Sequence, residues 1–465
     1  MASAALAPTE LGTEKIGKLL KMYAVPGIIA QTAASLYNMV DSIYIGHIPG
    51  VGSAAISGLA VTFPLMNLAT AMGTLVGVGA TTLISVLLGQ KNYDTARKVL
   101  SNVLSLNLII GFLFSALTLA FLDPILRFFG ASDVTLPFAR DYMLIILIGN
   151  VFTHLYFGFN GLIRASGHPK TAMGLTLFTV ISNAILDPIF IFVFGMGIQG
   201  AAMATVICQM AALVYTLKFF FNRKNLLHFP KPVFQIEWRI AKQSLAIGLG
   251  PFLMNSAACL VALFINQQLG KYGGDLAIGA YGIVNRLTML FIMVCMGFNQ
   301  GLQPIAGYNY GARQYHRVKE IFILTARWEI LVTLLCFLMA ELIPELAVSL
   351  FTNDPEMIEM SSKALRIMCA GTAFVGFGIT TSTFFQCLGM VSKSIFLSLS
   401  RQLIFLLPLI YTLPMWLQER GVWWSFPIAD MLSVVVSLIF VLRLFKKFDK
   451  LRDGQDAETL GSAIE

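Results

Sequence analysis

The chain has 465 residues, of which 57% are hydrophobic and 12% are charged, and its mean hydropathy is +0.77. Soluble globular proteins carry about 25% charged residues, so this composition excludes a soluble domain and indicates a membrane protein with many spans. The formal net charge of +8 does not indicate a nucleic-acid partner, because the basic residues lie in short loops beside apolar runs.

A helix needs about 20 apolar residues to span a bilayer, and breaks at Gly, Pro and charge clusters divide this chain into twelve such runs. The predicted spans cover residues 18–46, 54–88, 97–122, 134–164, 171–195, 198–221, 240–269, 276–308, 317–343, 356–388, 394–417 and 422–446. We therefore expect an all-α membrane protein embedded in the lipid bilayer.

The first span contains two unusual residues. Pro26 lacks a backbone N–H, so we expect a helix bend near it. Asp41, in the stretch NMVDSIYIGH, lies five residues before Gly46 and so roughly 8 Å below the outer end of the span. A carboxylate in hydrocarbon is costly, so Asp41 is expected to face protein or water, or to carry a proton.

Spans five and six carry polar residues at similar depths. Asp187 lies roughly 12 Å below the outer end of span five, and Thr205 lies roughly 10 Å below the same side of span six. Asn183 is one helical turn from Asp187 and shares its face. These depths are compatible with one cluster that includes Asp41. Ionisable groups inside spans are functional by default, and the alternative is that the acids only bond neighbouring helices.

The spans of the second half also contain charges. Arg286, Arg366, Arg401 and Asp430 each fall roughly 12–15 Å into their spans. Buried charges need partners, so Arg401 and Asp430 are expected to pair within a structural network. A basic wall that accepts an anionic group of a substrate is the other interpretation.

Some of the abundant Phe and Met side chains are candidates to line a substrate cleft, because Met adapts to varied ligands. With one arginine, the candidates are Phe63, Met66, Met254, Met289, Met293 and Arg286.

Lysine and arginine alternate between the loops. They gather before span one and after spans two, four, six, eight, ten and twelve, whereas the opposite loops contain few of them. The positive-inside rule then places both termini in the cytoplasm, and we expect a multi-pass protein of the inner (cytoplasmic) membrane.

The chain contains an internal repeat. The stretch that begins at Gly79 matches the stretch that begins at Gly301 (301 − 79 = 222), and the same offset pairs Gly167 with Gly389. Six spans in each half predict two lobes related by a pseudo-two-fold axis along the membrane normal. We expect an N-terminal lobe at residues 1–221, a cytoplasmic linker at 222–238, and a C-terminal lobe with a cytoplasmic tail at 239–465.

The sequence carries no sign of an enzyme. It contains no HExxH, GxSxG, Walker A or paired CxxC motif, and its six cysteines all fall within apolar segments. We expect no disulfide, no zinc site, no organic cofactor and no ATP-driven pumping.

Taken together, the spans, the repeat and several motifs resemble the multidrug and toxic compound extrusion (MATE) family. The motifs are NMVDSIYIGH, GVGATTLISVLLGQKN, RASGHPK, NAILDPIFIF and QGLQPIAGYNYGAR, and the resemblance covers nearly the whole chain. It implies an exporter of diverse compounds, driven by inward flow of protons or sodium ions.

One branch of this family keeps its coupling carboxylates on spans one and five, where Asp41 and Asp187 lie. Asn160, Asn183 and Thr205 match the polar partners of those acids, although counting along span four places Asn160 nearer the inner end. A second branch has acids on spans seven and ten. Neither span has a carboxylate here, which argues against a cation site in the C-terminal lobe.

We therefore expect a secondary active multidrug antiporter that exports lipophilic, often cationic compounds by alternating access. Burial and mutual repulsion would let the two acids take and release protons near neutral pH. The same oxygens could ligate sodium. The alternatives are a flippase for polar or oligosaccharide-linked lipids and an exporter of an anionic metabolite. We expect a monomer.

Overall fold

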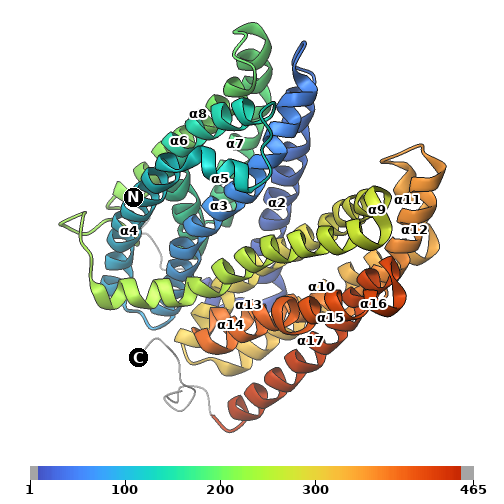
Figure 1. Cartoon of the computed structure of the whole chain (residues 1–465). Coiled ribbons are helices and arrows are strands. Elements are labelled where there is room, and N and C mark those ends of the chain that lie inside the picture. Colours follow the sequence, from blue (N-terminus) through green and yellow to red (C-terminus); the bar gives the residue numbers. More distant parts are fainter. Residues whose placement is uncertain (1–8, 452–465) are drawn as a thin grey trace. The chain divides into compact units, whose positions relative to one another are not determined.

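A computed structural model describes residues 9–451, apart from the side chains of residues 38, 39, 42, 46, 52, 53, 56 and 275. Contacts between Cα atoms divide the chain into two compact units. The first unit holds Ile29–Phe252 and the chain start through Thr13, and the second holds Glu14–Ile28 and the chain from Leu253 onward. All regular structure in the described residues is helical (Figure 1).

The helices of the first half run through the first unit, although α2 begins within the second. They are α1 (Glu10–Thr13), α2 (Ile16–Gly46), α3 (Gly52–Gly89), α4 (Tyr93–Ala120), α5 (Leu122–Phe128), α6 (Leu136–Ala165), α7 (Pro169–Pro188), the π-helix η1 (Ile189–Val193) and α8 (Ile198–Phe221).

The helices of the second half run through the second unit, although α9 begins within the first. They are α9 (Trp238–Gly311), α10 (Tyr315–Leu342), α11 (Pro344–Ser349), α12 (Pro355–Cys369), the 3-10 helix η2 (Thr372–Phe374), α13 (Val375–Cys387), α14 (Val391–Leu399), the π-helix η3 (Ser400–Leu406), α15 (Leu407–Thr412), α16 (Pro414–Leu417) and α17 (Glu419–Phe448). In α9 two helices meet at Gly274, which has φ of 68°.

The predicted spans correspond to these helices. Ten helices in the described residues are long and apolar enough to cross a membrane, and α12 with η2 and α13 forms one further span with a 47° bend. The remaining predicted span is α2, a helix of 31 residues. Many apolar side chains on these helices are exposed, among them Phe112 at 70% and Leu117 at 56%, as expected of surfaces that face lipid.

The repeat offset of 222 residues is preserved in the structure. Helix α4 begins at Tyr93 and α10 at Tyr315, and α6 ends at Ala165 where α13 ends at Cys387. The turns match as well, because Lys91 and Arg313 share a left-handed φ of 58°. The two halves therefore fold as the same six-span pattern.

Local sequence signals define several helix ends. The side chain of Asn92 accepts a hydrogen bond from the backbone N–H of Thr95 at 3.2 Å and caps α4. The side chain of Asp354 caps α12 by accepting from the backbone N–H of Glu356 at 3.2 Å. Pro355, at the first turn of α12, needs no hydrogen-bond partner for a backbone N–H.

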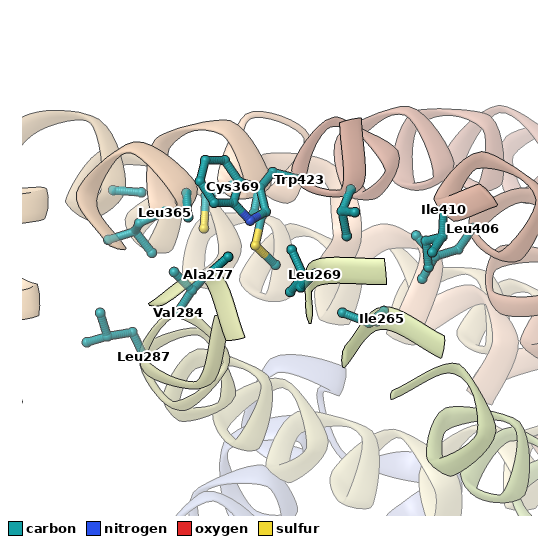
Figure 2. Packing of buried hydrophobic residues seen from close by; sticks show 14 of the residues in the cluster. Ile265, Leu269, Ala277, Val284, Leu287, Leu365, Cys369, Leu406, Ile410 and Trp423 are labelled. Atoms are coloured by element: carbon teal, nitrogen blue, oxygen red, sulfur yellow. The ribbon is translucent and has the colours of Figure 1, made fainter. Parts of the chain in front are cut away.

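Each half of the chain has its own apolar core. In the first half, residues of α3, α5, α6, η1 and α8 pack together. In the second half, Leu269, Val284, Cys369 and Trp423 lie at the centre of a cluster that joins α9, α12 and α17 (Figure 2).

Glycines explain where the two units begin and end along α2 and α9. A Cβ atom on Gly79 would lie 1.8 Å from the carbonyl oxygen of Ser244, and one on Gly248 would lie 1.7 Å from that of Leu75. The first part of α9 is therefore pressed backbone to backbone against α3 in the first unit. In the second unit, Gly301 of α9 makes the equivalent contact with Ala24 of α2.

The segment between α8 and α9 is attached to α4. Glu237 forms an ion pair with Lys98 at 2.7 Å, and its backbone N–H donates to Asn102 at 3.0 Å. Arg97 donates to the carbonyl oxygen of Leu226 at 3.1 Å. The contact-defined units thus assign this segment to the first unit. The predicted lobes at 1–221 and 239–465 with a separate linker stay a prediction.

Candidate functional site

The candidate site lies in the first unit, where α2, α6, α7 and α8 meet. Asp41 lies near the end of α2 and is 7% exposed, and Asp187 lies near the end of α7 and is fully buried. Helix α8 packs against both α6 and α7. Two carboxyl groups are therefore enclosed by helices that come from separate parts of the chain.

The two acids contact each other directly. Their carboxyl groups are hydrogen-bond partners, and they also interact electrostatically. A carboxylate can only accept, so a hydrogen bond between two carboxyl groups requires that one of them carries a proton. Oδ1 of Asp41 and Oδ2 of Asp187 have no hydrogen-bond partner among the described residues.

A chain of polar groups leads away from the acid pair. The side-chain amide of Asn183 donates to Oδ1 of Asp187 at 2.6 Å, and the Thr205 hydroxyl is 3.3 Å from Oδ1 of Asn183. The Tyr37 hydroxyl is 3.3 Å from the Thr205 hydroxyl. Thr205 has one proton, which reaches either Asn183 or the carbonyl oxygen of Ala201 at 3.1 Å, so it can switch between two acceptors.

Helical periodicity explains why these side chains meet. Asn183 and Asp187 are four residues apart on α7, and Tyr37 and Asp41 are four residues apart on α2. Residues at this spacing lie on one face of a helix, one above the other. Two such faces, with Thr205 of α8 between them, complete the cluster.

Other buried groups enclose the acids. Tyr142 on α6 is 3% exposed and Cys208 on α8 is 2% exposed, and both interact electrostatically with Asp187. These side chains exclude bulk water from the pair. They strengthen every electrostatic interaction there, because the local dielectric is low.

The backbone beside Asp187 is irregular. Pro188 ends α7, and the π-helix η1 follows immediately. A Cβ atom on Gly200 of α8 would lie 2.7 Å from the backbone of Phe190, so α8 approaches η1 closely. Single π-turns occur often at functional sites, because they reposition side chains and free carbonyl groups.

One predicted neighbour lies elsewhere. The side-chain amide of Asn160 donates to the carbonyl oxygen of Ala172 at 3.2 Å, and its oxygen accepts from Arg164 at 3.4 Å. Ala172 belongs to the first turn of α7, roughly 22 Å along that helix from Asp187. The expectation that Asn160 surrounds the acids is therefore wrong, because it lies at the opposite end of the helices. The structure brings Asn183 and Thr205 to the pair.

The other predicted residues are dispersed. Pro26 lies within α2. Phe63 is 65% exposed on α3, Met289 is 40% exposed on α9, and Met66 packs against the first core. Met254, Met293 and Arg286 also lie on α9. Their assignment to a substrate cleft stays a prediction.

The predicted pairing of Arg401 with Asp430 is confirmed. Nε of Arg401 on η3 donates to Oδ1 of Asp430 on α17 at 2.5 Å, and Asp430 is 3% exposed. This bond supports the interpretation of a structural ion pair in the second half. Arg366 lies on α12 and Arg286 is exposed on α9.

Sequence reasoning missed two polar residues. Tyr37 shares the face of Asp41, and its spacing of four residues was the signal that could have identified it. Glu329 on α10 is fully buried and carries an acid in the middle of span nine, which was not considered. Among the described residues, no group of three or more His, Cys, Asp or Glu side chains is arranged to hold a metal ion.

Comparisons with known proteins agree with this architecture. The family model described as MatE matches residues 26–189 and 251–412. The multidrug export protein MepA of Staphylococcus aureus (strain MSSA476) is 27% identical over 427 residues, which are 92% of this chain and 94% of that protein.

Two solved structures are also similar. The MATE multidrug transporter DinF-BH, solved in complex with a drug-like ligand, is 35% identical, has a TM-score of 0.86, and is matched over 93% of this chain and 96% of its own. A MATE structure in the bent conformation has a TM-score of 0.89, is 24% identical, and is matched over 95% and 98% of the two chains.

Proposed function

This chain belongs to the MatE family of membrane transporters, and from that membership we propose that it is a proton-driven multidrug exporter. Its substrates are lipophilic compounds, often cationic. The relatives described as multidrug export proteins and the complex of DinF-BH with its drug-like ligand support this assignment.

The observation that carries the proposal is the enclosed acid pair of Asp41 and Asp187. A site that needs one proton to join two carboxyl groups responds to proton supply. Binding a second proton removes the remaining negative charge. Losing both leaves two repelling carboxylates in a buried place, which favours a different arrangement of the helices.

Several features favour the proton over sodium as the coupling ion. Asn183 presents its amide N–H groups to Oδ1 of Asp187, and a cation cannot bind an oxygen from the side of such a donor. Sodium, as a hard cation, needs several oxygen ligands at once. Here the hydroxyl of Thr205 is turned toward Asn183 and Ala201 instead.

Helix α2 connects the acid pair to a weak point in the backbone. Pro26 supplies no N–H, so the carbonyl group of Met22 lacks its helical donor. The helix can bend there at low cost when the charge at Asp41 changes. Substrate and proton need not touch, provided that each prefers a different arrangement.

The surroundings of the transporter follow from the loop charges. Lys and Arg gather in the loops on one side, and this asymmetry supports a cytoplasmic location for both termini in the inner membrane. The transporter acts as a monomer, without an organic cofactor.

Transport of ethidium, a fluorescent lipophilic cation, in proteoliposomes tests the proposal. A proton gradient with no sodium present should drive uptake or release against the concentration gradient, and an opposite pH gradient should reverse it. A sodium gradient at equal pH on both sides should have no effect. Transport that follows sodium alone contradicts the proton as coupling ion.

Drug susceptibility separates this function from lipid flipping. Expression in a host that lacks its own exporters should raise the tolerated concentration of lipophilic cations. A chain that leaves susceptibility unchanged but restores growth of a flippase-deficient strain contradicts the proposed export.

A further inference from the structure

A second buried acid lies in the half of the chain that has no Asp41–Asp187 pair. Glu329 is 0% exposed, and neither of its carboxyl oxygens has a hydrogen-bond partner among the described residues. It lies roughly 21 Å from the start of α10 and roughly 20 Å from its end. Its carboxyl group is therefore at the middle of a membrane span.

The groups that face Glu329 are neutral. Thr380 of α13 brings its hydroxyl beside the carboxyl group, and the thiol of Cys295 of α9 interacts with it electrostatically. Helices α11, α12 and α17 and the short η2 also pack against α10. Within the described residues, none of them brings a Lys, Arg or His side chain to the carboxyl oxygens.

These surroundings suit a carboxylic acid and not a carboxylate. An unpaired charge in such a place is costly, because burial removes the hydration of the ion and no opposite charge replaces it. The Thr380 hydroxyl donates its only proton to the carbonyl oxygen of Gly376 at 2.9 Å. Its oxygen can therefore accept a proton from a neutral Glu329 but has none to donate to a charged one.

An interrupted helix packs on the same turn of α10. The span formed by α12, η2 and α13 bends by 47° at its break. One turn after Glu329, the Thr333 hydroxyl donates to the carbonyl oxygen of Ala373 in η2 at 3.0 Å. A Cβ atom on Gly376 would lie 2.6 Å from the backbone of Glu329. Interrupted helices are where membrane carriers place ion sites.

The first half of the chain lacks both features. The repeat offset places Asn107 of α4 at the position of Glu329, and Asn107 is also fully buried with no hydrogen-bond partner for its side chain among the described residues. An amide holds no exchangeable acid proton. The matching span in the first half, α6, is one continuous helix of 30 residues. The acid and the break therefore occur together, and only in the second half.

We propose that Glu329 is a second proton-binding site, which holds its proton in this arrangement and releases it when the break between α12 and η2 opens to water. The step transfers one proton from the carboxyl group to water, leaving a carboxylate, with no change of oxidation state. This inference rests on the proposed proton-driven export and adds a site in the second half.

Infrared difference spectroscopy of the full chain in lipid, between about pH 5 and about pH 10, tests the site itself. Wild type should lose a carboxylic-acid C=O band on alkalinisation, and Glu329→Gln should lack that band. Glu320→Gln, an exposed acid on the same helix, should keep it. Identical difference spectra for wild type and Glu329→Gln overturn the proposal, whether or not the chain proves to be proton-driven.

Ethidium transport in proteoliposomes tests the role of the site. Glu329→Gln fixes the neutral form, so proton-driven export should fall about 10-fold, a barrier change of about 1.4 kcal/mol. Glu329→Asp should recover part of the rate, and Glu320→Gln should equal wild type. If wild type follows the proton gradient and Glu329→Gln exports at the same rate, the site is not part of transport while the proposed function stands.

Discussion

The side-chain amide of Asn183 donates to Oδ1 of Asp187 over 2.6 Å, one helical turn away on α7. This bond fixes the orientation of the carboxyl group and occupies one of its oxygens. Oδ2, which has no hydrogen-bond partner among the described residues, remains to exchange a proton. The same amide uses its oxygen to accept from Thr205, so the acid is oriented by a neighbouring helix as well.

Replacing Asp187 with Asn should abolish proton-driven export while the protein still folds. Asn fills the same volume and removes a buried acid, so the free energy of unfolding should change by no more than about 1–2 kcal/mol. Ethidium transport and thermal unfolding in detergent measure the two effects. Asp133→Asn is the control, because Asp133 is 89% exposed in its ion pair with Arg127 and should export normally. Full proton-driven export by Asp187→Asn would remove this residue from the coupling site.

Thr205 is expected to act through its hydroxyl. Thr205→Val keeps the shape but removes the group that joins Tyr37 to Asn183, so export should fall about 5–10-fold, as for one lost buried hydrogen bond. Thr205→Ser keeps the hydroxyl and should retain most of the rate. The pH at half-maximal export, measured for both variants, should shift only in Thr205→Val. Equal profiles for the two variants would mean that only packing matters at this position.

The glycine contacts of α9 with α3 should be sensitive to a single methyl group. Gly248→Ala would place a Cβ atom 1.7 Å from a backbone oxygen, so the helices must separate, and the free energy of unfolding should fall by about 1–3 kcal/mol. Gly174→Ala, in the interior of α7 with nothing within 4 Å of its Cβ position, should stabilise by up to about 1 kcal/mol. Apparent melting temperatures in detergent distinguish them, and equal values would contradict the close contact.

The ion pair of Arg401 with Asp430 should show strong coupling. Arg401→Leu leaves a carboxylate that is 3% exposed without its partner, so the free energy of unfolding should fall by about 3–5 kcal/mol. Adding Asp430→Leu should recover much of this loss, because no unpaired charge remains. A double-mutant cycle on thermal unfolding measures the coupling. Strict additivity of the two single changes would show that the bond contributes little.

The fold could be predicted from the sequence to the level of spans, because each span is a long apolar run between charged loops. The repeat could also be predicted, since Gly79 and Gly301 begin matching stretches and close helix contacts need these glycines. The break after Cys369 could not, because Gly371 has a counterpart, Gly149, inside the unbroken α6. What differs is the packing around them, which one sequence does not reveal.

The site could be predicted in part. Depth along a helix brought Asp41, Asp187 and Thr205 to one level, and a four-residue spacing added Asn183. Depth says nothing about rotation around the helix axis, so it could not show which side chains face each other. Asn160 matched a family pattern, but it lies five residues from the end of α6 and bonds to the opposite end of α7.

The division of α2 between the two units affects the order of assembly. Residues Glu14–Ile28 leave the ribosome early, but their packing partners lie beyond Leu253. A nascent chain that has completed only its first half still exposes this segment to the translocation machinery or to lipid. Domains generally fold as their last residues emerge, so neither half can finish alone. A stop codon after the first six spans should therefore yield a fragment that is degraded, and co-expression of the missing half should rescue it.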